Sequence, residues 1–142
     1  MLYSYLNKAL SNIIVAKQAL YAFKELKAKD LKNLASYNTQ QAIELIIKHC
    51  IYEKTDYSKQ IYSHDLEMLI LKYCNKLDIQ VPNIIRRNAR MYTRWEAESR
   101  YDLHYSVKIK SIEIALDEAE KWLIEIKPTY KRKIEYINKK YK

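Results

Sequence analysis

Glycine is absent from the 142-residue sequence, and proline occurs only at Pro82 and Pro128. Loops that cradle phosphate groups need glycine for their backbone geometry, so Walker-type and dinucleotide-binding fingerprints are excluded. Tight β-hairpins also rely on glycine at positive φ, which disfavours a fold built on sheets. Because so few residues break a helix, the sequence favours long uninterrupted helices.

Cysteine is scarce as well, with Cys50 and Cys74 in apolar helical stretches. Neither has a partner at a spacing typical of a metal site, and we expect buried free thiols in a reducing compartment rather than a disulfide. No His/Cys/Asp/Glu cluster in the sequence has metal-ligand spacing, so we expect neither a metal nor another cofactor.

Long apolar runs are missing too. The N-terminal residues do not resemble a signal peptide, and no stretch approaches the roughly 18 apolar residues that a membrane span needs. Apolar residues make up 49% of the chain and charged residues 30%, as in ordinary globular proteins. We therefore expect a cytoplasmic protein with no membrane span.

The formal net charge is +9, and its distribution is uneven. Residues 86–110 hold seven basic and three acidic residues, and residues 127–142 hold seven basic and one acidic, giving +4 and +6. The remainder of the chain has a net charge of −1. A positive field of this kind attracts phosphate of a nucleotide, of RNA or of an acidic partner, although a solubilising surface explains it equally well.

Apolar residues recur every three or four positions over most of the chain, which predicts amphipathic helices at about 2–23, 31–52, 63–77, 82–92 and 105–126. The second is apolar on nearly all sides at 42–47, so it should be central. We predict an all-α, up-and-down bundle of four to five helices over residues 1–127. Residues 128–142 form a basic C-terminal tail, in which Tyr130, Ile134 and Ile137 predict a short helix.

A polar strip runs along one side of the central helix, at Gln41, Glu44 and Lys48. Glu44 and Lys48 have the spacing of an ordinary helix-stabilising ion pair. Ser63 is a candidate N-cap for the third helix, and His64 is expected to cap or pack at that helix start. The same strip, with His64, could also support a functional segment.

Basic and aromatic residues alternate before the last helix of the bundle. Phosphate-binding side chains beside aromatic faces are typical of single-stranded RNA binding, and a solvated helix face is the alternative. The candidate nucleotide- or RNA-binding residues are Arg86, Arg87, Arg90, Arg94 and Tyr101, with Tyr92 and Trp95 as candidate stacking faces.

Three local motifs occur in order on this helical frame. They are Gln41-Ala42-x-Glu44-x-x-x-Lys48, then His64-Asp65-Leu66, then Arg100-Tyr101. In this order they resemble the HEPN family, over roughly residues 5–126. The resemblance implies a compact helical bundle that commonly forms a homodimer. It also implies a nucleotide- or RNA-related role, because many members are RNases of toxin–antitoxin or phage-defence systems and others are encoded beside nucleotidyltransferases.

The sequence departs from the RNase motif of that family. In those enzymes four to six residues separate the catalytic arginine from the histidine, whereas only three residues separate Arg100 from His104. If the segment is helical, Arg100 and His104 share a face, where they could stabilise phosphorane charge and move a proton.

We therefore predict a HEPN-type protein without the full RNase motif, with a nucleotidyltransferase as a candidate partner. The alternatives are a metal-independent RNase toxin that uses Arg100 and His104, and a non-catalytic interaction module.

Overall fold

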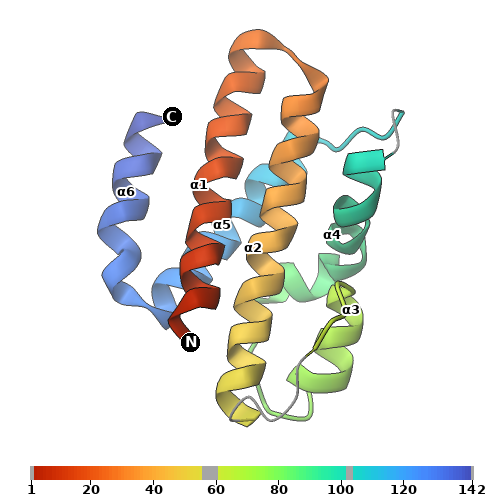
Figure 1. The fold of residues 1–142 in the computed structure, drawn as a ribbon, viewed down its shortest axis with the longest axis vertical. Helices are drawn as coiled ribbons and strands as arrows, with labels where there is room; N and C mark the ends of the chain where they lie inside the picture. Colours follow the sequence, from red (N-terminus) through yellow and green to blue (C-terminus); the bar gives the residue numbers. More distant parts are fainter. Residues whose placement is uncertain (1, 56–60, 102–103, 142) are drawn as a thin grey trace.

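A computed structural model of the chain describes residues 2–55, 61–101 and 104–141. The predicted all-α class is confirmed, and the described residues form six α-helices where four to five were expected (Figure 1). They are α1 (Leu2–Leu26), α2 (Lys29–Thr55), α3 (Leu66–Leu69), α4 (Asn83–Tyr101), α5 (Ile109–Ile126) and α6 (Lys131–Lys140). A π-helical turn (Ile70–Cys74) follows α3, and a 3₁₀ turn (Pro128–Tyr130) precedes α6.

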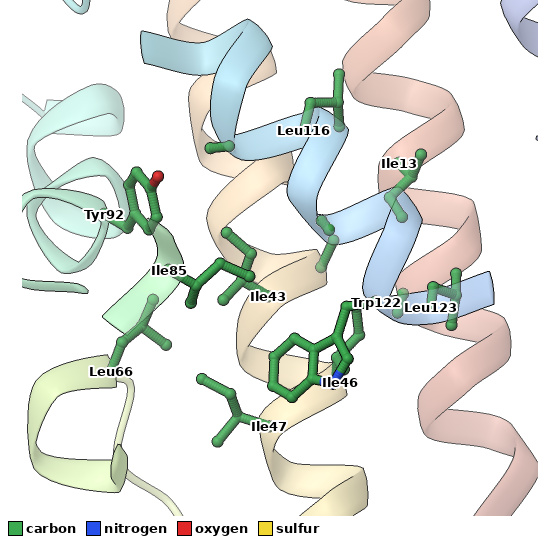
Figure 2. Packing of buried hydrophobic residues seen from close by; sticks show 14 of the residues in the cluster. Ile13, Ile43, Ile46, Ile47, Leu66, Ile85, Tyr92, Leu116, Trp122 and Leu123 are labelled. Carbon is green, nitrogen blue, oxygen red and sulfur yellow. The ribbon is translucent and has the colours of Figure 1, made fainter. Parts of the chain in front are cut away.

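Helix α2 lies at the centre of the bundle and contacts α1, α4, α5 and the π-helical turn. Its residues Ala42, Ile43, Ile46 and Ile47 are fully buried, as the apolar stretch at 42–47 predicted. Figure 2 shows the isoleucines of α2 packed between Ile85 and Tyr92 of α4 on one side and Leu116, Trp122 and Leu123 of α5 on the other. The core therefore surrounds α2.

Two turns that would ordinarily use glycine are made by other residues. Lys27 and Asp78 adopt the left-handed conformation, with φ of 59° and 55°. That conformation costs a residue with a Cβ roughly 1–2 kcal/mol. At Lys27 the cost is offset in part by a hydrogen bond of 2.7 Å from its backbone N–H to the Phe23 carbonyl, which closes the last turn of α1. The chain thus connects α1 to α2 without glycine.

The third helix differs from its prediction. Asp65, not Ser63, is the N-cap, and its carboxylate accepts a hydrogen bond from the Met68 N–H. The Ser63 hydroxyl instead accepts a hydrogen bond from the Asp65 N–H. The α-helix ends at Leu69, where the chain continues as the wider π-helical turn. A π-helical turn contains one residue more than an α-helical turn, so the buried positions after Leu69 are Ile70 and Cys74.

Helix α4 is longer than predicted, since it continues past Tyr92 to Tyr101. The reason is that its buried row continues: Ile85, Ala89, Tyr92 and Trp95 follow one another at helical spacing and are all buried. Helix α5 is shorter than predicted and begins at Ile109 rather than near residue 105.

The C-terminal residues form α6, which lies beside α1 and runs in the same direction (Figure 1). Tyr130 and Ile134 are buried in the core cluster. Near the start of α6 the Tyr130 hydroxyl donates to Asn7, and at its end Tyr141 accepts a hydrogen bond from Gln18. That residues 1–127 and 128–142 are separate units stays a prediction.

Burial also determines the protonation state of the two thiols. Cys74 is buried and Cys50 half-buried, and both are free. Burial raises the pKa of Cys74 to about 11 and that of Cys50 to about 12, so both stay protonated at neutral pH.

Candidate functional site

Six buried polar residues lie along one side of α2, at successive spacings of three and four. Because residues at these spacings share a helix face, they form a continuous row, which we call the α2 polar seam. Its members are Asn33, Ser36, Gln40, Glu44, Lys48 and Tyr52. The sequence predicted only the middle of this row, at Glu44 and Lys48.

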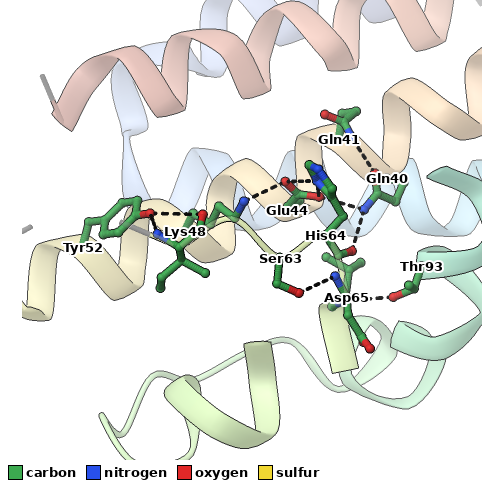
Figure 3. A network of polar contacts seen from close by, with 11 residues as sticks. Gln40, Gln41, Glu44, Lys48, Tyr52, Ser63, His64, Asp65 and Thr93 are labelled. Carbon is green, nitrogen blue, oxygen red and sulfur yellow. Dashed lines mark hydrogen bonds and ion pairs between the residues drawn. The ribbon is translucent and has the colours of Figure 1, made fainter. Parts of the chain in front are cut away.

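The carboxylate of Glu44 is the centre of the seam. Its Oε2 accepts from Lys48 Nζ at 3.0 Å, and its Oε1 accepts from Gln40 Nε2 at 3.1 Å. Nδ1 of His64 lies 3.0 Å from both carboxylate oxygens (Figure 3). The side chains of Glu44 and Lys48 are only 4% and 8% exposed. The pair is therefore a buried ion pair and not the solvated helix pair that the spacing alone suggested.

His64 belongs to a short non-helical segment, residues 61–65, which the seam holds against α2. Gln40 Nε2 lies 3.4 Å from the His64 carbonyl oxygen, and the Tyr52 hydroxyl accepts from the Ile61 N–H at 2.6 Å. At the end of the segment, the Leu66 N–H donates to Thr93 Oγ1 of α4 at 2.9 Å. The segment thus bridges α2 and α4, while the side chain of His64 remains 56% exposed.

Gln41, the other predicted member of the polar strip, lies at the margin of the seam. Its Nε2 donates to Gln40 Oε1 at 2.7 Å, so it acts on Glu44 through its neighbour. Gln40 is fully buried and contacts both Glu44 and His64. Sequence analysis missed Gln40, although its position four residues before Glu44 was a usable signal.

The other end of the seam holds the chain on both sides of residues 100–103. Ser36 Oγ lies 2.7 Å from Ser99 Oγ, and Asn33 Nδ2 lies 3.4 Å from the Tyr105 carbonyl oxygen. Beside the seam, Lys32 Nζ donates to Ser106 Oγ at 2.9 Å. Burial raises the pKa of Tyr105. The guanidinium carbon of Arg94 lies over the ring of Tyr105, 5.8 Å from the ring centroid.

The candidate catalytic pair falls only in part within the described residues. Arg100 and Tyr101 end α4, but their side chains lie outside the described part of the chain. His104 is exposed and lies in a turn after the helix. The premise that Arg100 and His104 share one helical face is therefore wrong, because α4 ends between them.

The predicted arginines lie on α4, where Arg87, Arg90 and Arg94 form an exposed row at spacings of three and four. We call this the α4 arginine row. Arg90 pairs with Glu67 at 3.1 Å and Arg94 with Glu98 at 3.0 Å. The hydrogen bond that Arg94 donates to the Glu98 carboxylate raises the pKa of Arg94. Both pairs are substantially exposed, so an incoming anion can replace their carboxylates at little cost.

Arg86 differs from the row, because it is half-buried and donates to Asn75 Oδ1 at 2.7 Å. The two aromatic candidates also differ from prediction: Tyr92 and Trp95 are each 1% exposed. Burial raises the pKa of Tyr92 to about 12. Their rings pack in the core, and the expectation that they stack on bases is wrong.

Among residues 2–55, 61–101 and 104–141, no group of three or more His, Cys, Asp or Glu side chains is placed to bind a metal ion. Within the same residues, no helix has the length and apolar character required to cross a membrane.

Comparison with known protein families gave a match over most of the chain. The sequence model of the HEPN domain matches residues 7–129, which is most of the chain and includes α2, the 61–65 segment and α4. Neither curated proteins nor solved structures gave a match. The match covers all three sequence motifs, of which the first two meet in the contact between Glu44 and His64, and the chain belongs to the HEPN family.

Proposed function

We propose that this protein acts in a nucleotide- or RNA-related system of the toxin–antitoxin or defence type, by binding phosphate groups rather than by cleaving RNA. The observation that supports this most is the α4 arginine row, with Arg87, Arg90 and Arg94 exposed on one face. Guanidinium groups bind phosphate oxygens in a bidentate manner, and the net charge of +9 adds a long-range attraction.

The seam supports the same proposal by giving the arginine row a fixed neighbour. His64 is held by Glu44, and its segment is bonded to Thr93, directly before Arg94. The half-exposed imidazole offers a further hydrogen-bonding group on a segment that is bonded to α4. Since Tyr92 and Trp95 are buried, we expect recognition of phosphate and sugar and not of stacked bases.

The first prediction concerns polyanion binding. Replacing Arg87, Arg90 and Arg94 together with Ala is expected to weaken binding of a fluorescent single-stranded RNA at least tenfold at about 0.1 M salt. Loss of three phosphate contacts should also make the plot of log K against log salt less steep, by about 2 units of slope. Fluorescence anisotropy over a salt series measures both quantities.

Two matched variants serve as controls for this prediction. Lys121→Ala removes an exposed cation of α5 that pairs with Asp117, and it should leave binding unchanged. Lys139→Ala with Lys140→Ala tests the contribution of the basic C-terminal charge. Undiminished affinity in the triple variant would exclude the arginine row as the binding surface.

The second prediction concerns assembly, because the proposal includes a homodimer with the 94–105 segment at its interface and a nucleotidyltransferase as a partner protein. Ser99 and Tyr105, which belong to this segment, are each anchored to α2. Light scattering should give twice the chain mass of 17.1 kDa at micromolar concentrations. A mass of one chain over that range would refute the dimer.

The third prediction concerns the runner-up function, a metal-independent RNase that uses Arg100 and His104. One observation favours it: α4 ends at Tyr101, so helical spacing does not fix where His104 lies relative to Arg100. We nevertheless expect no cleavage, because the motif has one residue fewer than its relatives require. Incubation with structured and unstructured RNA tests this, with Arg100→Ala and His104→Ala as controls. Cleavage that both substitutions abolish would establish the RNase and overturn the proposal.

A further inference from the structure

An open apolar groove lies between α1 and α6, on the side of the bundle opposite α4 (Figure 1). Its volume is about 500 Å³, and it is lined by Ile14, Arg132, Lys133, Tyr136 and Ile137. We call it the α1–α6 groove. We propose that it binds an acidic amphipathic helix of a partner protein. Helix α6 lies beyond residues 7–129, so one wall of the groove falls outside the part of the chain that matches the family, while Ile14 on the other wall falls within it.

The groove has a rigid wall because α6 is fastened to the bundle along its whole length. Ile134 is buried against the core, and Asn138 Nδ2 donates to Glu120 Oε2 at 3.3 Å. Glu120 is itself buried and forms an ion pair with Lys17 of α1. Together with the Tyr130–Asn7 contact, these bonds hold α6 at a fixed position against α1. A partner would therefore meet a preformed surface.

The lining of the groove fits the apolar face of a helix. Ile14 and Ile137 are partly buried, whereas Tyr136 is 64% exposed. Apolar side chains from a partner helix at positions i, i+3 and i+4 would cover these atoms, as in other helix-in-groove complexes.

The charge around the groove selects an acidic partner. The exposed residues of α6 include Lys131, Arg132, Lys133, Lys139 and Lys140, against one carboxylate, Glu135. On the other wall, α1 has no acidic residue before Glu25. The partner must therefore carry carboxylates beside its apolar face, where they can reach Arg132 and Lys133.

The apolar lining favours a protein helix over RNA or a membrane. RNA binding relies on phosphate contacts and stacking, which Arg132, Lys133 and Tyr136 could make. Such contacts would, however, leave the apolar surface of Ile14 and Ile137 uncovered. Binding to a membrane surface requires a broad apolar helix face, whereas the exposed surface of α6 is mostly Lys and Arg. A helix that combines leucines with carboxylates satisfies both parts of the groove.

The probe for the test is a fluorescent designed helix of about 14 residues, roughly four turns, with leucines on one face and glutamates elsewhere. A peptide of the same composition with the leucines distributed round the helix is its control. We expect the amphipathic peptide to bind the full-length protein at least tenfold more tightly than the scrambled one, measured by anisotropy at 0.15 M salt.

Three variants locate the site. Tyr136→Ala removes exposed apolar surface and Lys133→Glu reverses a rim charge, and each should weaken binding about tenfold. Lys139→Glu reverses a charge on the same helix outside the groove lining and should change affinity less than about threefold, because salt screens distant charges. Circular dichroism confirms that each variant is folded.

Other outcomes overturn the proposal. These are equal binding of the two peptides, no binding at all, or binding unaffected by Tyr136→Ala and Lys133→Glu. If single-stranded RNA or phosphatidylserine vesicles bind in a Tyr136-dependent manner while the amphipathic peptide does not, the groove belongs to a nucleic acid or a membrane instead.

Discussion

The candidate site depends on the contacts that the buried carboxylate of Glu44 makes with its neighbours. A carboxylate inside a helical bundle costs several kcal/mol unless it is paired and hydrogen-bonded. Here Lys48 supplies the opposite charge, while Gln40 and His64 provide further polar contacts. Because these groups come from two parts of the chain, satisfying Glu44 also fixes the 61–65 segment against α2. Thr93 extends this constraint to α4 and so to the arginine row.

The α2 polar seam allows one helix to hold two separate parts of the chain. Its lower half binds residues 61–65, and its upper half binds Ser99 and Tyr105 on either side of residues 100–103. These regions are far apart in sequence, but both lie along the face of α2 that carries the seam. The functional segments are positioned by polar contacts, whereas the surrounding apolar residues hold α2 itself in place.

Sequence reasoning reached the fold class and the central position of α2, because apolar periodicity reports directly which helix faces are buried. It also selected Glu44 and Lys48, but it could not tell that this pair is buried. The same spacing occurs in exposed helix pairs, and burial depends on what packs over it. Gln40 was missed for a related reason: Gln40 and Gln41 lie four and three residues before Glu44, so either spacing shares its helix face, and the packing of the 61–65 segment decides which of the two is buried.

The predictions for α3 and α4 were wrong because the sequence pattern alone did not show which side chains are buried. A π-helical turn changes the period of the buried row, so Ile70 and Cys74 enter the core after a strict α-helical pattern has begun. In α4 the large aromatic residues Tyr92 and Trp95 were interpreted as ligand-binding faces, although they are the anchors that extend the helix. Aromatic residues beside arginines are consistent with either role until burial is known.

The most direct test of the central constraint is amide hydrogen exchange in the variant Glu44→Leu with Lys48→Met. This change removes both charges together, so it leaves no unpaired buried ion that would unfold α2. The account predicts that the amides of Ile61, Asp65 and Leu66 lose protection while those of α1 and α5 keep theirs. Lys24→Met with Glu113→Leu, which removes an ion pair between α1 and α5, should leave residues 61–66 protected. Unchanged protection at Ile61, Asp65 and Leu66 in the Glu44 variant would contradict the account.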